Sequence, residues 1–385
     1  MRLHDFGGAL RKIITANVFA GTCGSTCPEG MLCEEACVLR PTGRPIRIRD
    51  IQASAFLFGR RELPGRLPAL QTSKVAVVGA GPAGLACAYY LRGAGTPVTV
   101  FERDRSPGGM LARGIPEYRL DPEVVRAEIE FATRGVEVRR EVPAAECTLA
   151  AFKKQGYEAV FLATGLWESV PVKIEGGQLE GVLDGTRLLE ALARGEREGL
   201  PDRGRVAVIG GGNTACDVAI YLTRRTDCDV TVYYRRTRTE MPAFRHEVNE
   251  ALAEGVKFEF LVAPVAVQGK TGVEGLLLKR VRLGEPDASG RPRPLPVEGS
   301  EFTVPCDYVV FAMGATADTA WLKRAFGVEV SREARIAVVP ETLATSVAGV
   351  FAGGDLVRPQ GLVVEAVADG RKAASAIRAY LGAEI

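Results

Sequence analysis

The chain has 385 residues, and its 49 lysines and arginines nearly balance 47 aspartates and glutamates, giving a net charge of +2. This mixed charge does not indicate nucleic-acid binding, and no apolar run reaches the roughly 20 residues that span a bilayer. The length predicts two to three domains. The two histidines, His4 and His246, do not have the spacing of metal ligands, so neither a histidine metal site nor a histidine general base is expected.

Residues 1–68 are predicted to form a small helical domain around four closely spaced cysteines, Cys23, Cys27, Cys33 and Cys37. Nothing resembles a secretory signal, so we expect a cytoplasmic protein whose close thiolates bind metal rather than form disulfides. Zinc sites separate their cysteine pairs by about 12–20 residues, and the separation here is shorter. Iron–sulfur ligation is therefore favoured, with the proline after Cys27 also typical of cluster loops. A zinc site and an unligated block are the alternatives.

A glycine-rich turn follows a predicted linker over residues 60–68. The apolar run Val75–Val78 predicts a strand buried on both faces, and a helical stretch follows the glycines. Such glycines allow a tight turn, a close approach of the backbone to a pyrophosphate and close packing of the helix. The residues of this turn are Gly79, Gly81, Pro82, Ala83 and Gly84. Glu102 ends the next predicted strand, at the spacing of an acid that binds a ribose diol.

The segments that follow favour FAD as the nucleotide of this first turn. Paired glycines within residues 107–111 suit a backbone that wraps around a long ligand. Near the C-terminus, a strand ending in Gly354 and Asp355 precedes an apolar helix over residues 363–380. We expect Asp355 to hydrogen-bond a ribityl hydroxyl. A helix N-cap is its alternative role, and the two roles can coexist.

A second glycine-rich turn, with different chemistry, follows the apolar run Val206–Ile209. Its residues are Gly210, Gly211, Gly212, Asn213 and Thr214. Aligning the strands that follow the two turns places Tyr234 where Glu102 stands in the first. The acid that would bind a ribose diol is therefore absent from the second turn.

Two arginines, Arg235 and Arg236, come directly after Tyr234, and Arg238 is a weaker third candidate. An acid here would repel a 2′-phosphate, whereas a guanidinium fork binds one. The second turn is therefore predicted to bind NADPH in preference to NADH, with a solvated basic turn as the alternative. The proline- and arginine-rich segment 284–296 is expected to be a solvated hairpin tip.

Two strands that end in small residues, 158–165 and 308–314, close the two nucleotide-binding segments. This near-repeat predicts an α/β fold with two Rossmann-like dinucleotide-binding domains. The NAD(P)H-binding domain, residues 171–316, is expected to be inserted in the FAD-binding domain, residues 69–170 and 317–385.

With these motifs, the chain resembles the glutamate synthase small-subunit family of flavoproteins. That family includes the N-terminal half of dihydropyrimidine dehydrogenase, its bacterial NAD(P)H-oxidising subunit and the bifurcating ferredoxin–NADP transhydrogenases. The resemblance covers nearly all of residues 15–385 and implies FAD in the first site, NAD(P)H in the second and iron–sulfur clusters leading to a partner. The FAD set is completed by Gly109, Met110, Arg119, Val142, Gly165, Gly354 and Asp355. The NAD(P)H set is Gly210, Gly212, Asn213, Thr214, Arg235, Arg236 and Gly314.

The cysteine block departs from the family pattern, which has a further cysteine motif upstream and two [4Fe–4S] clusters; no cysteine precedes Cys23 here. The resemblance implies that Cys27, Cys33 and Gln52 help bind one cluster and Cys37 the other, whereas Cys23 matches a position that is not a ligand. Three arrangements are open. The four cysteines hold one cluster, a partner chain supplies ligands, or the sequence is shortened or has lost its clusters.

We therefore predict an NADPH-oxidising, FAD-dependent electron-input subunit. It would pass electrons through flavin and an iron–sulfur cluster to a partner subunit with FMN, ferredoxin-like or iron–sulfur groups, in a hetero-oligomer. Cofactors carry out the hydride transfer, so no catalytic acid or base is expected. The alternatives are the same module serving dihydropyrimidine dehydrogenase or a ferredoxin–NADP transhydrogenase, and a non-catalytic assembly subunit. A disulfide reductase of the thioredoxin reductase kind would need a C-x-x-C motif, and the sequence has none.

Overall fold

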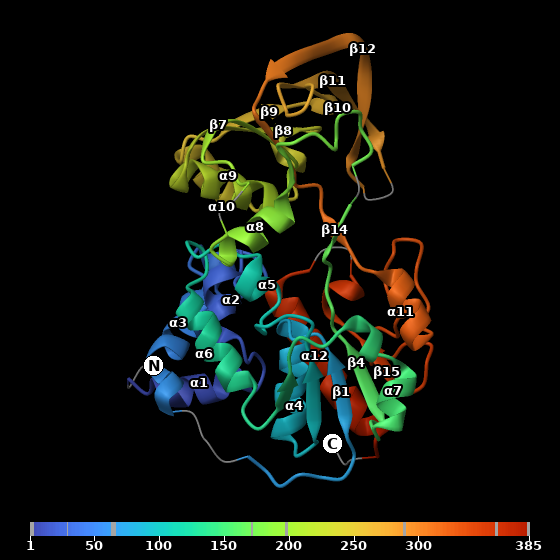
Figure 1. Cartoon of the computed structure of the whole chain (residues 1–385). Helices are drawn as coiled ribbons and strands as arrows, with labels where there is room; N and C mark the ends of the chain where they lie inside the picture. The colour runs from blue at the N-terminus through green and yellow to red at the C-terminus, as the bar shows by residue number, and fades with distance from the viewer. Residues whose placement is uncertain are drawn as a thin grey trace. The chain divides into compact units, whose positions relative to one another are not determined.

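The computed structural model describes residues 4–28, 30–62, 67–170, 172–196, 199–287, 290–358 and 361–382. The chain divides into two compact units, a first unit of Met1–Trp167 with Ala317–Ile385 and a second unit of Glu168–Thr316. Each unit contains a parallel five-stranded sheet, so the predicted α/β fold with two Rossmann-like sheets is confirmed (Figure 1). The predicted linker over residues 60–68 falls partly outside the described residues.

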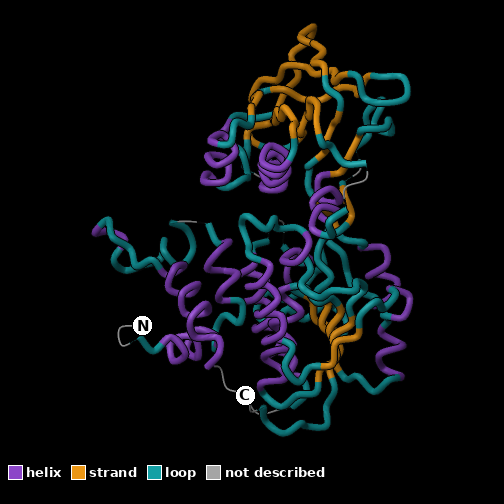
Figure 2. The backbone as a smooth tube through the Cα atoms, turned by 60° about the vertical axis from the view of Figure 1, so that its left-hand side comes forward, coloured by secondary structure: helices purple, strands orange, loops and turns teal. Residues whose placement is uncertain are grey.

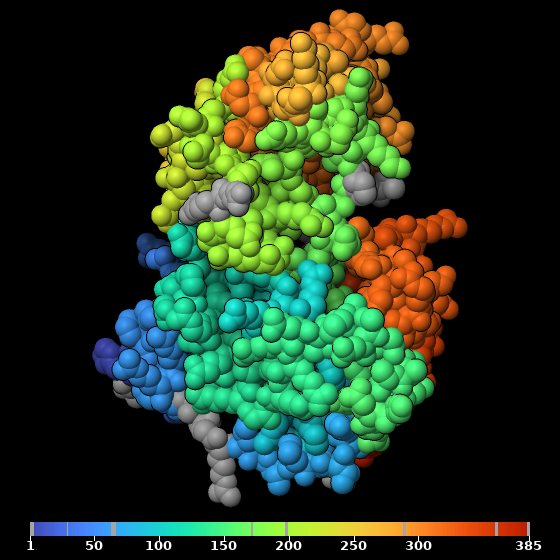
Figure 3. Space-filling model, in the orientation of Figure 1, coloured from blue at the N-terminus to red at the C-terminus, as the bar shows by residue number. Residues whose placement is uncertain are grey.

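The first unit begins with helices that share the hydrophobic core of its sheet. They are α1 (Phe6–Ile14), α2 (Ala20–Thr26) and α3 (Ile48–Gly59), with the short 3-10 helices η1 (Arg40–Thr42) and η2 (Arg60–Glu62). Leu10, Phe19 and Phe56 are buried in one cluster with Val75 and Phe131, which belong to the sheet and to a helix that covers it. In the space-filling view this N-terminal part forms a continuous surface with the neighbouring residues of the first unit (Figure 3).

The sheet of the first unit has the strand order β15-β4-β1-β2-β3, all parallel. Its strands are β1 (Val75–Val78), β2 (Val98–Phe101), β3 (Glu137–Arg139), β4 (Ala159–Leu162) and β15 (Val350–Ala352). Alternate residues of β1 belong to two different cores: Val75 and Val77 lie in one, Ala76 and Val78 in the other. This burial on both faces explains the unbroken apolar run that predicts the strand.

Helices lie beside both faces of this sheet (Figure 2). They are α4 (Pro82–Gly93), α5 (Met110–Arg113), α6 (Pro122–Ala132), α7 (Leu149–Lys154), α11 (Thr319–Phe326) and α12 (Val363–Tyr380), with the 3-10 helices η3 (Ala144–Glu146) and η5 (Gly354–Leu356). Small residues let α12 approach α4 closely, because a side chain at Gly370 would collide with the backbone of Ala83. No helix in the described ranges is long and apolar enough to cross a membrane.

The second unit has a parallel sheet with the order β6-β13-β7-β8-β9 and an antiparallel sheet with the order β10-β11-β12. The parallel strands are β6 (Val182–Asp184), β7 (Arg203–Ile209), β8 (Asp227–Tyr234), β9 (Lys257–Phe260) and β13 (Tyr308–Phe311). The antiparallel strands are β10 (Val262–Gln268), β11 (Gly275–Pro286) and β12 (Pro292–Pro305). The helices are α8 (Gly185–Ala193), α9 (Asn213–Arg225), α10 (Arg245–Ala253) and η4 (Arg238–Glu240).

Two short strands enter and leave the second unit. β5 (Glu168–Ser169) and β14 (Ala315–Thr316) pair with each other in antiparallel fashion. The segment 284–296, predicted as a hairpin tip, covers the facing ends of the paired strands β11 and β12 and the residues between them, of which 288 and 289 fall outside the described part.

Candidate functional site: two dinucleotide turns and a cysteine block

The first turn forms where β1 meets α4. The Gly79 N–H donates to the Phe101 carbonyl at 2.8 Å. Gly79 has a φ of +102°, and a Cβ there would lie 2.5 Å from the Ala163 carbonyl oxygen, so only glycine fits. The predicted glycine pair docks on this turn, since the Gly108 N–H donates to the Ala80 carbonyl at 2.8 Å. The structure thus brings together the predicted FAD residues of the turn and of the following loop.

Glu102 lies at the end of β2 and is 5% exposed. Its carboxylate accepts hydrogen bonds from the Ala80 N–H at 2.7 Å and the Asp104 N–H at 2.9 Å. Burial raises the pKa of Glu102, while these two hydrogen bonds and Arg113 lower it. A carboxylate has about four lone-pair positions, so those left unused by the backbone can accept from a ribose diol. The residues present fit an adenosine ribose at this position.

Sequence reasoning missed Arg113, which lies on α5 and is 6% exposed. It forms an ion pair with Asp104, and its guanidinium lies 4.4 Å from the ring centroid of Trp167. Arg103 lies 5.1 Å from the same ring. The signal available in the sequence was an arginine inside an otherwise apolar, glycine-rich stretch. Its position beside Asp104 and near Glu102 adds positive charge next to the predicted ribose site of FAD.

The other predicted FAD residues lie around the same sheet edge. The Val142 N–H donates to the Glu102 carbonyl at 2.9 Å, and Gly165 follows β4. Met110 begins α5, and Arg119 precedes α6, where its N–H donates to the Pro116 carbonyl at 3.0 Å.

Gly354 and Asp355 belong to the C-terminal segment and lie beside the beginning of α4. A Cβ at Gly354 would lie 3.1 Å from the Cβ of Ala83 in the first turn. The Gly354 N–H donates to Asp369 at 2.9 Å, and Asp369 is held by Arg358 at 2.5 Å. The alternative N-cap role of Asp355 is wrong, because the N-cap of α12 is Leu362.

The Asp355 carboxyl group is largely buried. Burial raises its pKa, while Arg335 and Arg358 lower it. Buried oxygens that lie beside helix starts are suited to accept a hydrogen bond from a ligand hydroxyl. The position therefore fits the predicted contact with a ribityl chain.

The second turn repeats the backbone of the first with different side chains. Ile209 pairs with Tyr233 as Val78 pairs with Phe101, so Tyr234 and Glu102 occupy equivalent positions, as the sequence alignment predicts. The Tyr234 ring occupies the space that a Cβ at Gly211 would need. Its hydroxyl donates to the Glu240 carbonyl at 2.9 Å, so the ring is held in place.

The start of α9 leaves room for a ligand. Gly212 is the N-cap of α9, and a Cβ built there meets nothing within 4 Å; the same holds at Gly314. Asn213 uses its side-chain oxygen to accept from the Phe244 N–H at 2.9 Å, and Thr214 is half-buried beside it. Helix N-termini with open backbone N–H groups bind phosphate, so these residues fit a pyrophosphate.

The two predicted phosphate-binding arginines differ in their surroundings. Arg235 reaches the surface, whereas Arg236 is only 2% exposed. Arg236 donates to Asp287 at 2.8 Å and to the Pro292 carbonyl at 2.7 Å, so the structure gives it a role other than the predicted one. The third candidate, Arg238, is hydrogen-bonded to Asn249.

Cys23 and Cys27 lie one turn apart on α2 and its C-cap. The hydrogen bond between the two sulfurs, followed by burial, raises the pKa of Cys23, and the same hydrogen bond lowers the pKa of Cys27. Cys23 also hydrogen-bonds the Asn17 side chain at 3.8 Å, and Asn17 donates to Gln52 at 2.8 Å. Predicted ligand Gln52 is thus linked to the cysteine helix through Asn17.

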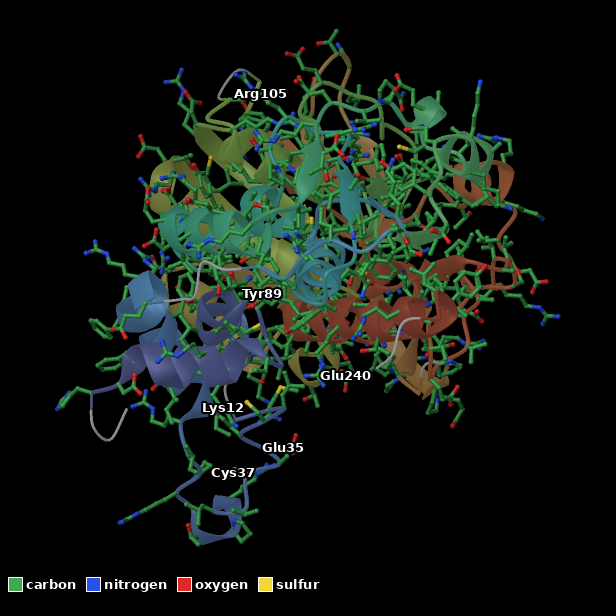
Figure 4. All side chains as sticks on the ribbon, turned by 90° about the horizontal axis from the view of Figure 1, so that it is seen from below. Lys12, Glu35, Cys37, Tyr89, Arg105 and Glu240 are labelled. Atoms are coloured by element: carbon green, nitrogen blue, oxygen red, sulfur yellow. The ribbon has the colours of Figure 1, made fainter. Side chains whose placement is uncertain are left out.

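Cys33 is exposed, and the Cys37 sulfur accepts from the Ile46 N–H at 3.3 Å. Figure 4 shows Cys37 and Glu35 on a peripheral loop, away from Tyr89 of α4. Across the described ranges, no three or more His, Cys, Asp or Glu side chains form a group that could hold a metal ion. Among the described residues, these cysteines alone therefore do not form a complete cluster site.

Two nucleotide turns on parallel sheets, one with the acid Glu102 at the ribose position and the other with Tyr234 followed by Arg235, are typical of a flavin- and nicotinamide-dependent oxidoreductase. The model of the pyridine nucleotide-disulphide oxidoreductase family matches residues 73–370, and a model described as dihydropyrimidine dehydrogenase domain II, 4Fe-4S cluster, matches residues 1–60. The chain belongs to the pyridine nucleotide-disulphide oxidoreductase family and, within it, to the glutamate synthase small-chain group. This confirms the predicted oxidoreductase class and, at family level, the cofactors FAD, NADPH and a [4Fe–4S] cluster.

Several curated relatives are subunits of redox enzymes. The chain is 41% identical to the beta subunit of NADP(+)-dependent formate dehydrogenase from Moorella thermoacetica, covering 97% of this chain but 56% of that protein. It is 38% identical to the glutamate synthase [NADPH] small chain of Escherichia coli, covering 95% and 81%. It is 36% identical to the NADPH-Fe(3+) oxidoreductase beta subunit of Geobacter sulfurreducens, covering 93% and 57%. The chain therefore spans little more than half the length of two of these relatives.

Solved structures show the same fold at low identity. FprA from Mycobacterium tuberculosis superposes with a TM-score of 0.71 at 19% identity, covering 81% of this chain and 85% of that one. Thioredoxin reductase from T. acidophilum superposes with a TM-score of 0.60 at 21% identity, covering 80% and 99%. At these identities the likeness establishes the fold alone.

Proposed function

We propose that the chain is an NADPH-oxidising, FAD-dependent electron-input subunit of the glutamate synthase small-subunit type. The observation that carries the proposal is the contrast between the two turns. At equivalent positions the first presents the Glu102 carboxylate and the second presents Tyr234 followed by Arg235. A diol is recognised by the acid and a 2′-phosphate by the arginine. The contrast between Glu102 and Arg235 therefore supports FAD binding by the first unit and NADPH binding by the second.

FAD, when bound, accepts a hydride from NADPH and can release its electrons one at a time. The chain itself binds and orients the two nucleotides. Backbone N–H groups at the starts of α4 and α9 are offered to the two pyrophosphates. We expect the largely buried Asp355 to accept a hydrogen bond from a ribityl hydroxyl. No side chain needs to move a proton for hydride transfer, so we assign none to that task.

The partner is proposed from the relatives. The E. coli glutamate synthase small chain is covered over 81% of its length, which favours a glutamate synthase type of complex. The formate dehydrogenase and Fe(3+) oxidoreductase subunits, and the family model of dihydropyrimidine dehydrogenase domain II, support the same module with other partners. We propose a partner subunit with FMN or iron–sulfur groups in a hetero-oligomer. Cys23, Cys27, Cys33, Cys37 and Gln52 are the ligand candidates for a cluster that such a partner completes.

An anaerobic assay of the purified full-length chain tests this function. NADPH should bleach the bound flavin, and the reduced protein should then reduce ferricyanide, a one-electron acceptor, with two equivalents for each NADPH. Purification of the native complex should recover a second redox subunit. A chain that holds no flavin would instead support the alternative of a non-catalytic assembly subunit.

A further inference from the structure

The tip of the β11–β12 hairpin lies against the end of β8 in the second unit, and the contact is built on Arg236. The guanidinium of Arg236 spans two partners, the Asp287 carboxylate at 2.8 Å and the Pro292 carbonyl at 2.7 Å. These partners stand on either side of the tip, since Pro286 pairs with Pro292 at the end of the hairpin. Because Arg236 is 2% exposed, solvent does not compete for its two hydrogen bonds.

The tip is also closed on itself. The Asp287 N–H donates to the Arg291 carbonyl at 2.8 Å, and the Arg291 N–H donates to the Asp287 carboxylate at 3.4 Å. Strand β11 of the hairpin is also linked to Arg236 through Leu261. The Leu261 N–H donates to the Arg236 carbonyl at 3.2 Å, and the Val281 N–H of β11 donates to the Leu261 carbonyl at 2.8 Å. The backbone of Arg291 is therefore held next to Arg236, which directly follows Arg235 in the sequence.

We propose that Arg291, supplied by this hairpin, completes the 2′-phosphate site with Arg235, while Arg236 fastens the hairpin and does not bind the phosphate. The inference deepens the proposed NADPH function by naming a residue, distant in sequence, that selects between NADPH and NADH. The end of the second strand of a Rossmann unit is where the 2′ position of the adenosine ribose lies. A residue held beside that strand end meets the group that distinguishes the two nucleotides.

The electrostatics around Arg235 agree with this assignment. Partial burial, and after it the charges of Arg236 and Arg291, lower the pKa of Arg235, whereas Asp287 raises it. Asp287 and Arg236 neutralise each other through their ion pair. Arg235 and Arg291 are then a pair of like charges that a dianionic phosphate would bridge, with charge-assisted hydrogen bonds from both guanidiniums.

Binding of NADP⁺ and NAD⁺ to the oxidised, FAD-loaded full chain tests the proposal by calorimetry, without turnover. The two ligands differ only in the 2′-phosphate. Arg291→Ala should weaken NADP⁺ binding by about tenfold or more, the loss expected for one charge-assisted hydrogen bond, and leave NAD⁺ binding within about twofold. Arg291→Lys keeps the charge but loses the planar fork, so it should recover part of the affinity for NADP⁺.

A matched control is Arg282→Ala, which removes the same charge from β11, where Arg282 is exposed and is not among the groups that act on Arg235. It should leave both affinities unchanged. Unchanged NADP⁺ binding in Arg291→Ala would overturn the proposal. So would an equal loss for NADP⁺ and NAD⁺ in both Arg291 variants, since that pattern indicates damage to the fold.

Arg235→Ala separates this inference from the function on which it rests. If Arg235→Ala weakens NADP⁺ selectively and Arg291→Ala does not, the NADPH assignment stands and the role of Arg291 is rejected. If wild-type protein binds NADP⁺ and NAD⁺ equally, the proposed NADPH preference itself fails.

Discussion

The ring of Tyr234 packs against Gly211 in the second turn, at the place where Glu102 accepts a hydrogen bond from the Ala80 N–H in the first. The two pairs occupy equivalent positions on parallel strands, as the strand registers show. In one turn the ribose position is therefore filled by an acceptor, and in the other by an aromatic wall followed by Arg235. This difference is the structural basis of the two proposed nucleotide assignments.

Gly211→Ala should impair the second turn selectively. The added methyl group would collide with the Tyr234 ring, and overpacking of this kind costs about 1–3 kcal/mol. We expect the KM for NADPH to rise by about tenfold, with FAD content unchanged, as measured by steady-state kinetics and flavin absorbance.

A second substitution tests the cause of that effect. Tyr234→Ala removes the ring, so the Gly211→Ala, Tyr234→Ala double variant should lose less than the sum of the two single losses. Strictly additive losses would show that the collision with the ring is not responsible.

Glu102→Gln should weaken FAD binding by about 10- to 100-fold, because hydrogen bonds to a charged group are worth about 1.5–3 kcal/mol. Release of FAD on dilution, followed by flavin fluorescence, measures the change. Glu137→Gln is the matched control, since Glu137 lies on the neighbouring strand β3 and is exposed. Equal FAD affinity in wild type and Glu102→Gln would show that the Glu102 carboxylate does not contribute to FAD binding.

Glu128 makes the folding stability dependent on pH. It is fully buried on α6, where its carboxylate accepts from the Gly21 N–H at 2.6 Å and the Thr22 hydroxyl at 2.5 Å. Burial raises its pKa to about 7, from the 4.5 of a free glutamate. A raised pKa in the folded state stabilises the protein at acid pH, and this contribution is lost as pH rises from about 4.5 through 7.

Glu128→Gln removes that titration. The free energy of unfolding of the variant minus that of wild type should be about 2–3 kcal/mol larger at pH 8 than at pH 5. Urea unfolding at the two pH values measures it, with the exposed Glu123→Gln on the same helix as the control. A wild-type-to-variant difference that does not change with pH would show that Glu128 does not titrate in this range.

Iron and acid-labile sulfide in anaerobically purified protein test the cysteine block. We expect both to be present when the chain is purified with its native partner, and Cys27→Ser to lower the iron content of that complex by half or more. Cys228→Ser, in the second unit, should leave it unchanged. Protein free of iron, both alone and together with its native partner, would reject a metal role for Cys23–Cys37.

The sequence predicts the two turns well because their chemistry is local. A buried strand, glycines and the residue at the next strand end lie within about 30 residues, and backbone sterics decide the rest. The role of Arg236 was not predictable in this way. Its partners, Asp287 and Pro292, lie more than 50 residues away, and only the pairing of β11 with β12 brings them to β8. Arg113 was missed for a similar reason, because its contact with Trp167 depends on the tertiary fold.

For the cysteine block, the spacing in the sequence does not predict the local geometry. Its spacing predicts a shared site, yet the hydrogen bonds of Cys23 with Asn17 and of Cys37 with Ile46 direct these two sulfurs to protein groups. Close spacing in the sequence therefore does not determine which sulfurs lie close together in space.

Rapid mixing of the FAD-loaded chain with NADPH or NADH in the absence of oxygen measures directly which nucleotide reduces the flavin. Bleaching of the flavin absorbance gives the rate of hydride transfer at each nucleotide concentration. We expect the ratio of rate constant to dissociation constant to be at least about tenfold higher for NADPH than for NADH, and Arg235→Ala to make the two ratios similar. Equal reduction by NADPH and NADH in the wild-type protein would contradict this expectation.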